Sequence, residues 1–473
     1  MQNRFRHLTW VMIGLWYLFC LATLDYNGPF LDEGIYITAG QRTLQGQGLS
    51  DGYLGWFAGS LLWPTLAGIG FKIGGLAGVR ALAALFAAIA LLVCARASAS
   101  LFGESAGFWT ALAFALNAPF LALARMGVYD STALAGMAVS FWAITQLYTR
   151  NHRVWLVVAA ASFTIGMFAK YPTGLMLLPL LAILVVLRKD KATTDIVFFG
   201  LVSLALALAF FLPVRGQVAP FIAYRLTHSP GSGVSVAMVA VDTWNLSAIH
   251  LALAICGWFA AKERRLLASM LVPCLLIWPT YHLALGDTVS KNKHLVLGFL
   301  FAYPLVGHLL SRMWQQGAHW TRLRRTATTA MVVVLAATGM TQLPRLNRAW
   351  PDVRPAATYL MKQVVPGQKL LTGQSWPYTI YLYQEQRIDS PWDVFDVYRI
   401  EHDQSDIDLC DYDWFVDTQG IGGWPQALRD QVHACGTFYP VFSTTSEVEN
   451  MGLDLDYIRY PVETTVWQNL QRK

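Results

Sequence analysis

Long apolar runs separated by short polar segments dominate the first 340 residues of the chain. A helix rises 1.5 Å per residue, so a run near twenty residues crosses about 30 Å of hydrocarbon. The pattern predicts eleven transmembrane helices, at residues 8–24, 79–95, 105–124, 131–148, 154–169, 172–187, 196–213, 246–261, 266–285, 295–310 and 326–340. The first run lacks a small-x-small cleavage site, so we expect a retained helix and not a signal peptide.

A twelfth apolar run, residues 56–74, contains Pro64, Lys72 and several glycines, which weaken a spanning helix. Loop charges decide its status, because cytoplasmic loops carry the excess of Lys and Arg. If this run does not cross, every dense basic cluster falls on the side of the N-terminus. We therefore expect a juxtamembrane or re-entrant helix in the outer leaflet, with the N-terminus cytoplasmic.

This topology places the more elaborate polar segments on the outer face. They are residues 25–78, 125–130, 170–171, 215–245, 286–294 and 341–473. The segment 215–245 contains two prolines and a Gly-Ser-Gly run, so we expect a mobile loop that orders over a bound lipid.

The residues after 343 have a different pattern from the rest. Short strands at 369–372 and 414–417 and helices at 356–364 and 426–432 predict a small extracytoplasmic α/β domain. Prolines 344, 351 and 355 mark the boundary, which gives a transmembrane domain at 1–343 and a C-terminal domain at 344–473. Whether Cys410 and Cys435 form a disulfide there stays open.

The composition supports a membrane protein. Hydrophobic residues make up 55% of the chain and charged residues only 14%. The core of a soluble protein could not bury so much apolar surface. The formal charge of +6 arises from Lys and Arg between the apolar runs and not from a basic patch, so we expect no nucleic-acid partner.

Three acids lie on the outer face. Asp32 and Glu33 begin an apolar stretch, and neighbouring helical positions point about 100° apart, so only one of the two faces a common site. The other binds backbone or a basic group. Asp130 precedes the fourth spanning run. Helix capping is an equally good explanation for all three acids.

Lys and Arg are usually concentrated in cytoplasmic loops, so basic residues on the outer face need an explanation other than topology. Lys170, Lys293 and His294 are the clearest of them, and Lys291, Arg125, Arg215 and Arg225 share the position. Lys and Arg are the usual partners of phosphate, so an anionic substrate is one explanation. Contact with lipid headgroups is the other.

The order of these features along residues 8–310 resembles the GT-C glycosyltransferases. The features are an Asp-Glu pair in a long first outer loop, a Pro-bearing juxtamembrane helix, an Asp after the third span, a Lys-x-Pro-x-Gly turn, and a late Lys-His before Tyr303-Pro304-Leu305. The closer branch is that of the protein O-mannosyltransferases and the bacterial aminoarabinose transferase of lipid A. The late pair differs from the Arg-Tyr that is common there.

The resemblance implies a GT-C-like fold and an inverting transfer of a sugar from a polyprenyl-phosphate donor to a lipid, glycan or protein. It implies Asp32 as general base with Glu33 beside it, and Asp130 and Tyr36 as residues that position the acceptor. Lys170, Lys293, His294 and Arg215 would bind the donor phosphate. Asp32, Asp130, Lys170 and Lys293 are accordingly expected to converge on one pocket. No metal is required, although an acid pair facing phosphate is able to hold Mg²⁺ or Ca²⁺.

The main alternative is a transporter or flippase of lipid-linked intermediates. Such a protein should carry ionisable residues near mid-bilayer and an inverted repeat, whereas the charges here lie mostly at span ends. The resemblance also implies a multi-pass protein of a bacterial inner membrane, with the C-terminal domain periplasmic or extracellular.

Overall fold

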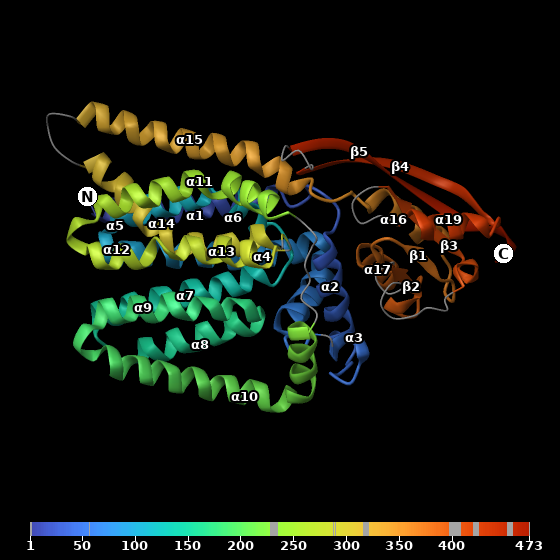
Figure 1. Ribbon diagram of the computed structural model, residues 1–473, viewed down its shortest axis with the longest axis horizontal. Helices are drawn as coiled ribbons and strands as arrows, with labels where there is room; N and C mark the ends of the chain where they lie inside the picture. Colours follow the sequence, from blue (N-terminus) through green and yellow to red (C-terminus); the bar gives the residue numbers. More distant parts are fainter. Residues whose placement is uncertain are drawn as a thin grey trace. The chain divides into compact units, whose positions relative to one another are not determined.

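The computed structural model describes residues 2–55, 57–227, 235–286, 288, 290–315, 321–396, 408–419, 425–451 and 457–472 (Figure 1). The chain forms two compact units. The helical unit comprises Met1–Leu24, Gln47–Trp63 and Arg80–Pro344, and the mixed unit comprises Asp25–Gly46, Pro64–Val79 and Arg345–Lys473. Segments 25–46 and 64–79, which were predicted to lie on the outer face, thus pack with the C-terminal residues. The domain boundary at residue 343 stays a prediction.

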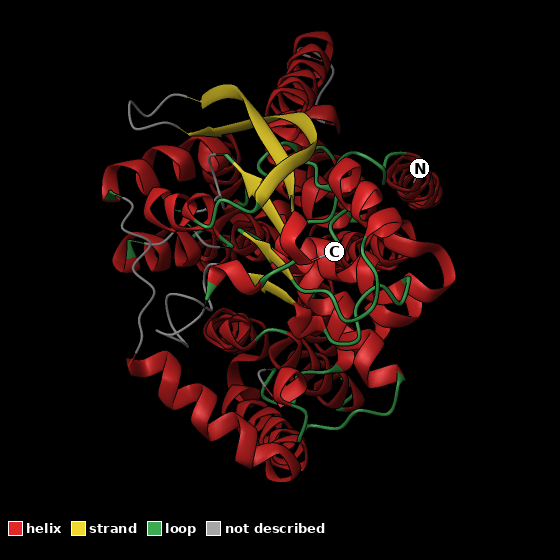
Figure 2. Cartoon of the chain, turned by 90° about the vertical axis from the view of Figure 1, so that its right-hand side faces the viewer, coloured by secondary structure: helices red, strands yellow, loops and turns green. Residues whose placement is uncertain are grey.

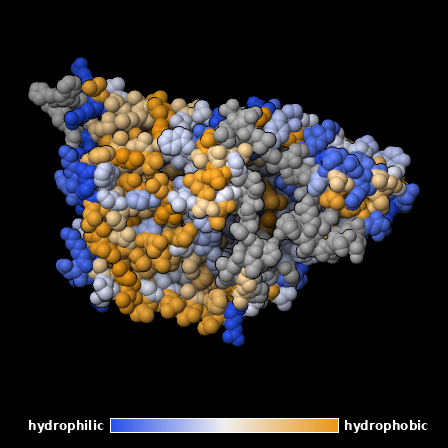
Figure 3. Space-filling model, in the orientation of Figure 1, coloured by the Kyte–Doolittle hydropathy of each residue, from blue (hydrophilic) through white to orange (hydrophobic). Residues whose placement is uncertain are grey.

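All eleven predicted apolar runs are helical, and the prediction of a polytopic helical membrane protein is confirmed. The helices that contain them are α1 (Gln2–Ala22), α4 (Leu62–Phe102), α5 (Glu104–Ala115), α6 (Ala118–Ala124), α7 (Asp130–Arg150), α8 (Val154–Ala169), α9 (Leu177–Arg188), α10 (Ala192–Thr227), α11 (Val236–Ala260), α12 (Arg265–Leu271), α13 (Cys274–Leu285), α14 (Lys291–Gln315) and α15 (Thr321–Asn347). Figure 3 shows hydrophobic side chains gathered over these helices.

Fewer than eleven of these helices are each long and apolar enough to cross a bilayer as a single helix. By length and composition, seven helices of the described residues qualify, or eight if the bent pair α5 and α6 counts as one span. The two members of that pair meet at 75°. The runs at 172–187 and 196–213 fall within one continuous helical stretch, Tyr171–Gly216, and α8 has only 16 residues.

The predicted juxtamembrane helix ends at a break inside α4. Gly74 and Gly75 leave helical geometry there, and Gly75 has a φ of 58°, which favours glycine. The chain then folds back closely, since a Cβ on Gly78 would lie 2.1 Å from the Gly70 carbonyl oxygen. The segment before the break is thus a separate helix that begins at Leu62, whereas its position in the outer leaflet stays a prediction, and α4 as a whole also qualifies as a span.

The expectation of a loop at 215–245 is wrong for most of its length. Helix α10 continues to Thr227 and α11 begins at Val236, and only residues 228–234 lie outside the described chain. Val214 and Val218, four positions apart on one face of α10, are buried against Ala58. That packing favours continuing the helix past Arg215.

The mixed unit contains a five-stranded sheet of order β2-β1-β3-β5-β4, drawn in yellow in Figure 2. The strands are β1 (Leu370–Thr372), β2 (Val394–Asp396), β3 (Trp414–Thr418), β4 (Phe438–Met451) and β5 (Tyr457–Asn469), with helices α16 (Arg354–Gln363), α17 (Ser375–Gln384) and α19 (Gln426–Ala434). Strands β1, β2 and β3 are parallel, and β5 is antiparallel to β3 and β4. The predicted C-terminal α/β fold is confirmed, and Cys410 and Cys435 are joined by a disulfide.

Candidate functional site

Helix α2 (Leu31–Leu44) carries the first acid pair, and its first turn separates the two carboxylates. Glu33 is fully buried, and its Oε2 accepts a hydrogen bond of 2.8 Å from the backbone N–H of Phe30. This closes one half of a capping box and satisfies an N–H that the helix leaves unpaired. Asp32 is half-buried and points about 100° away around the helix. The capping role expected for one of the pair thus falls to Glu33.

The mixed unit holds α2 at several points along its length. A Cβ on Gly34 would lie 2.5 Å from the Trp376 carbonyl carbon and 2.9 Å from the Pro377 nitrogen, so α2 touches the backbone of α17. The segment before α2 is tied by an ion pair between Asp25 and Arg354. A hydrogen bond to Asp352 raises the pKa of Arg354, so its guanidinium stays charged. The residues that follow 344 thus fix the helix that bears Asp32.

Replacing Gly34 by alanine should destabilise the mixed unit by about 1–3 kcal/mol, because the added methyl meets backbone that cannot rotate away. The gain in helix propensity, about 1 kcal/mol, is too small to offset a clash of this size. Thermal unfolding of the purified variant measures the effect. Gly48→Ala is the control, since a Cβ there meets nothing within 4 Å. A Gly34→Ala variant as stable as the wild type would mean that the two helices separate at no cost.

In the helical unit, Lys170 and Asp130 form a buried ion pair. Asp130 begins α7 and Lys170 follows the last residue of α8, and each side chain is 3% exposed. The ammonium also lies 5.1 Å from the centre of the Tyr129 ring. The backbone turn after Lys170 is fixed by Thr173, whose hydroxyl donates to the Lys170 carbonyl. Two residues forty positions apart are thus held together away from solvent.

The start of α14 brings more basic groups to the same place. The Nδ1 atom of His294 lies 2.9 Å from Nε2 of His282 on α13, and both rings are buried. Lys170 and Lys293 are close enough to His294 to act on it electrostatically. Lys291, 1% exposed, forms an ion pair with Asp242 of α11. These residues form what we call the cation cluster, which comprises Lys170, Lys291, Lys293, His282 and His294 with the carboxylates of Asp130 and Asp242.

The charges of the cation cluster favour an anion. Three buried lysines and two buried histidines gather here, and two of the lysines are in ion pairs with Asp130 and Asp242. Three buried atoms of the cluster, Nε2 of His294, Oδ2 of Asp130 and Nζ of Lys291, have no hydrogen-bond partner among the described residues, although the Lys291 ammonium is in an ion pair with Asp242. A phosphate oxygen arriving at the cluster would accept hydrogen bonds from a lysine ammonium and from the Nε2–H of His294.

The structure thus brings Asp130, Lys170, Lys293 and His294 together. Asp32, Glu33 and the buried Tyr36 belong to the mixed unit. Arg215 is exposed on α10, and no contact within the described chain joins it to the cation cluster. The side chain of Arg225 lies outside the described residues.

His282 and Asp242 belong to the cluster but were not predicted. His282 lies in the predicted span 266–285, and Asp242 lies in the predicted loop 215–245. For His282 the available signal was an ionisable group within an apolar run, which usually marks a functional site. Within the described part of the chain, no group of three or more His, Cys, Asp or Glu side chains is placed to hold a metal ion.

Comparisons with known proteins point to one family and one fold. The family model of the dolichyl-phosphate-mannose-protein mannosyltransferases matches residues 60–215, roughly a third of the chain, which includes Asp130 and Lys170. A search of the curated proteins finds no significant match.

Two solved structures of ArnT from Cupriavidus metallidurans are similar over almost the whole chain. The structure bound to undecaprenyl phosphate has a TM-score of 0.61 and 15% identity, over 97% of this chain and 98% of that one. The apo structure has a TM-score of 0.61 and 16% identity, over 98% of both chains. The chain has the GT-C fold. The resemblance inferred from the order of the motifs is confirmed, and the matching family and the structural neighbours of this GT-C protein are glycosyltransferases.

Proposed function

We propose that this GT-C protein is an inverting glycosyltransferase that moves a sugar from a polyprenyl-phosphate donor to an acceptor on the extracytoplasmic face of the membrane. The acceptor is a lipid, a glycan or a protein of the cell envelope. The protein would span a bacterial inner membrane with its N-terminus in the cytoplasm.

The observation that carries this proposal is the buried cation cluster. A surface patch of lysines would fit any anionic lipid, but Lys170, Lys291 and Lys293 are each less than 10% exposed. Buried basic groups gathered at one place stabilise a negatively charged ligand, because water screens their charges little there. The phosphate of a lipid-linked sugar is such a ligand, and ArnT, of the same fold, has been solved with undecaprenyl phosphate.

The proposed reaction breaks the bond between the anomeric carbon and the phosphate oxygen and forms a bond from that carbon to the acceptor oxygen. The acceptor loses its proton to Asp32, which acts as general base. The electron pair of the broken bond stays on the phosphate, and Lys170, Lys293 and His294 stabilise the charge that develops there. The leaving phosphate is a stable anion, so no acid needs to protonate it and no metal is required.

The remaining site residues have supporting parts in this proposal. Asp130 would orient Lys170 through their ion pair, and Tyr36 would help position the acceptor on α2. Glu33 would hold the first turn of α2 beside Asp32. Arg215 is exposed on α10. It would bind the donor phosphate while the lipid-linked donor enters from the membrane.

The disulfide between Cys410 and Cys435 supports an extracytoplasmic mixed unit, because such bonds persist in oxidising compartments. The dense basic clusters that the predicted topology places on the side of the N-terminus support a cytoplasmic N-terminus.

The test is a transfer assay with the full-length protein in proteoliposomes. A labelled undecaprenyl-phosphate sugar is the donor, and an extract of envelope lipids, glycans and proteins is the acceptor pool. We expect labelled acceptor and free undecaprenyl phosphate to appear in equal amounts. Liposomes without protein are the control. Movement of the intact labelled lipid across the bilayer without release of the phosphate would instead identify a flippase.

A further inference from the structure

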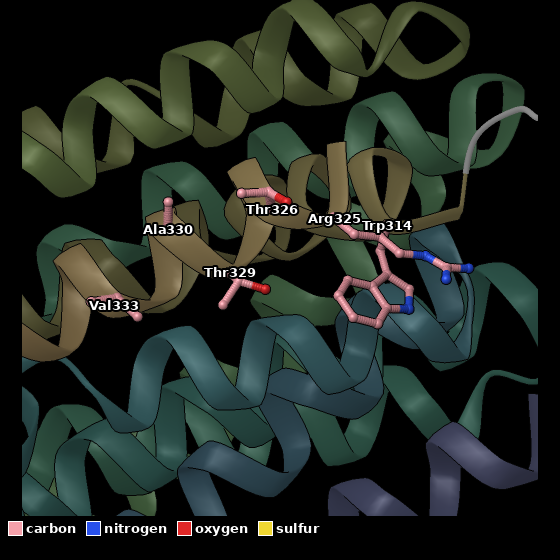
Figure 4. Close-up of a pocket in the computed structure, with 6 residues that line it drawn as sticks. All are labelled: Trp314, Arg325, Thr326, Thr329, Ala330 and Val333. Carbon is pink, nitrogen blue, oxygen red and sulfur yellow. The ribbon is translucent and has the colours of Figure 1, made fainter. Parts of the chain in front are cut away.

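A recess of about 450 Å³ lies between the end of α14 and the first half of α15 (Figure 4). It is lined by Trp314, Arg325, Thr326, Thr329, Ala330 and Val333. The last four residues follow the spacing i, i+3, i+4 and i+7, so they form one stripe along α15. The recess is therefore a groove parallel to a spanning helix, with a guanidinium at one end and methyl-bearing side chains at the other.

Only one side of α15 packs on the helical unit. Thr328 and Leu335, seven residues apart, are fully buried, whereas Val333 remains 59% exposed. Near its other end α15 approaches the bundle closely, since a Cβ on Gly339 would lie 2.4 Å from the Leu116 carbonyl oxygen. The exposed stripe of a spanning helix contacts lipid tails, so the walls of the groove suit an acyl chain.

The positive charge at the mouth of the groove favours binding of an anion. The Arg325 guanidinium lies 5.4 Å from the centre of the Trp314 ring, and Arg322 is exposed one turn earlier on α15. Neither arginine forms an ion pair within the described chain, and the undescribed residues 316–320 include no acid. A basic cluster with a Trp at the end of a spanning helix is typical of a site for an anionic headgroup.

The groove is separate from the cation cluster. Trp314 follows His294 by twenty residues on the same helix, which corresponds to about 30 Å, or the full thickness of the hydrocarbon layer. A lipid here would have its headgroup in the leaflet opposite to the candidate donor site.

We propose that this groove binds one anionic glycerophospholipid, with its phosphate at Arg325 and Arg322 and an acyl chain along Thr329, Ala330 and Val333. The arrangement supplies both halves of the lipid with a partner: guanidinium groups for the phosphate and an aliphatic stripe for the chain. The bound lipid would fill the space beside α15, the helix that leads into the mixed unit.

Native mass spectrometry of the purified full-length protein tests this proposal, with phosphatidylglycerol and phosphatidylcholine titrated separately in detergent. We expect one phosphatidylglycerol to bind more tightly than phosphatidylcholine. Arg325→Gln should weaken phosphatidylglycerol binding about fivefold, the effect expected for one arginine near an anionic lipid. Equal retention of both lipids, or a wild-type affinity in Arg325→Gln, would overturn the proposal.

A second pair of variants tests the acyl part of the groove. Val333→Trp fills the groove and should reduce binding, whereas Val334→Trp changes the neighbouring exposed valine, which does not line it. Equal binding in the two variants would contradict the proposed path of the chain. A competition experiment with inorganic phosphate distinguishes a lipid site from a simple ion site. If inorganic phosphate displaces the lipid completely, the groove binds an ion and not a lipid.

Discussion

Replacing Asp32 by asparagine should slow sugar transfer by about 10²- to 10⁴-fold, the usual contribution of a general base. Asparagine keeps the size of the side chain and its place at the start of α2 but cannot accept the acceptor proton. The affinity for undecaprenyl phosphate should not change, because the groups that would bind phosphate belong to the helical unit. Single-turnover transfer in proteoliposomes, together with donor binding, measures both quantities.

Glu33→Gln is the matched control for this prediction. Glutamine still offers an oxygen to the Phe30 backbone N–H, so the capping box and the fold of α2 survive. Transfer should stay near the wild-type rate even though a neighbouring carboxylate has been neutralised. Full activity in Asp32→Asn, or an equal loss in both variants, would show that Asp32 is not the base.

Replacing Lys170 by methionine should abolish donor binding and also destabilise the protein. The carboxylate of Asp130 would be left buried without its partner, which typically costs about 3–5 kcal/mol. Loss of transfer in this variant alone would therefore not separate a binding role from a structural one.

The double variant Lys170→Met/Asp130→Asn makes that separation. It removes both charges, so we expect thermal stability to recover most of the loss while binding of undecaprenyl phosphate stays absent. As a control, Arg96→Met/Glu104→Gln removes a partly exposed ion pair, which should cost about 1 kcal/mol or less and leave binding intact. Recovery of donor binding in the Lys170 double variant would mean that the ion pair serves only to hold α7 against α8.

Local features of the mixed unit were predictable only where the pattern was apolar. Strands β1 and β3 are short buried runs, and both were predicted. The long hairpin of β4 and β5 was not, since β4 reads Ser-Thr-Thr-Ser-Glu-Val-Glu-Asn over much of its length, with few apolar positions. Its strands exist because they pair with each other and with β3, a register that no single segment encodes.

The candidate site divides in the same way. The order of motifs predicted Asp32, Asp130, Lys170, Lys293 and His294 as site residues, but not the partners that Lys291 and His294 find in Asp242 and His282. The sequence offered capping and chemistry as equal explanations for the acid pair, and the hydrogen bond from Phe30 assigns capping to Glu33. The break between α5 and α6 was also missed. It depends on Asn117, which caps α6 and contacts His250 of α11.

The sequence by itself determined that this is a multispanning helical protein with a small C-terminal α/β fold, because crossing a bilayer requires only a local run of apolar residues. Tertiary structure decided which ionisable groups meet. Lys170 and Asp130 are forty residues apart, and His282 and Asp242 join the cluster from two further helices. Such contacts arise from the packing of helices against one another. They depend on which residues are close in space, and the local sequence does not encode this.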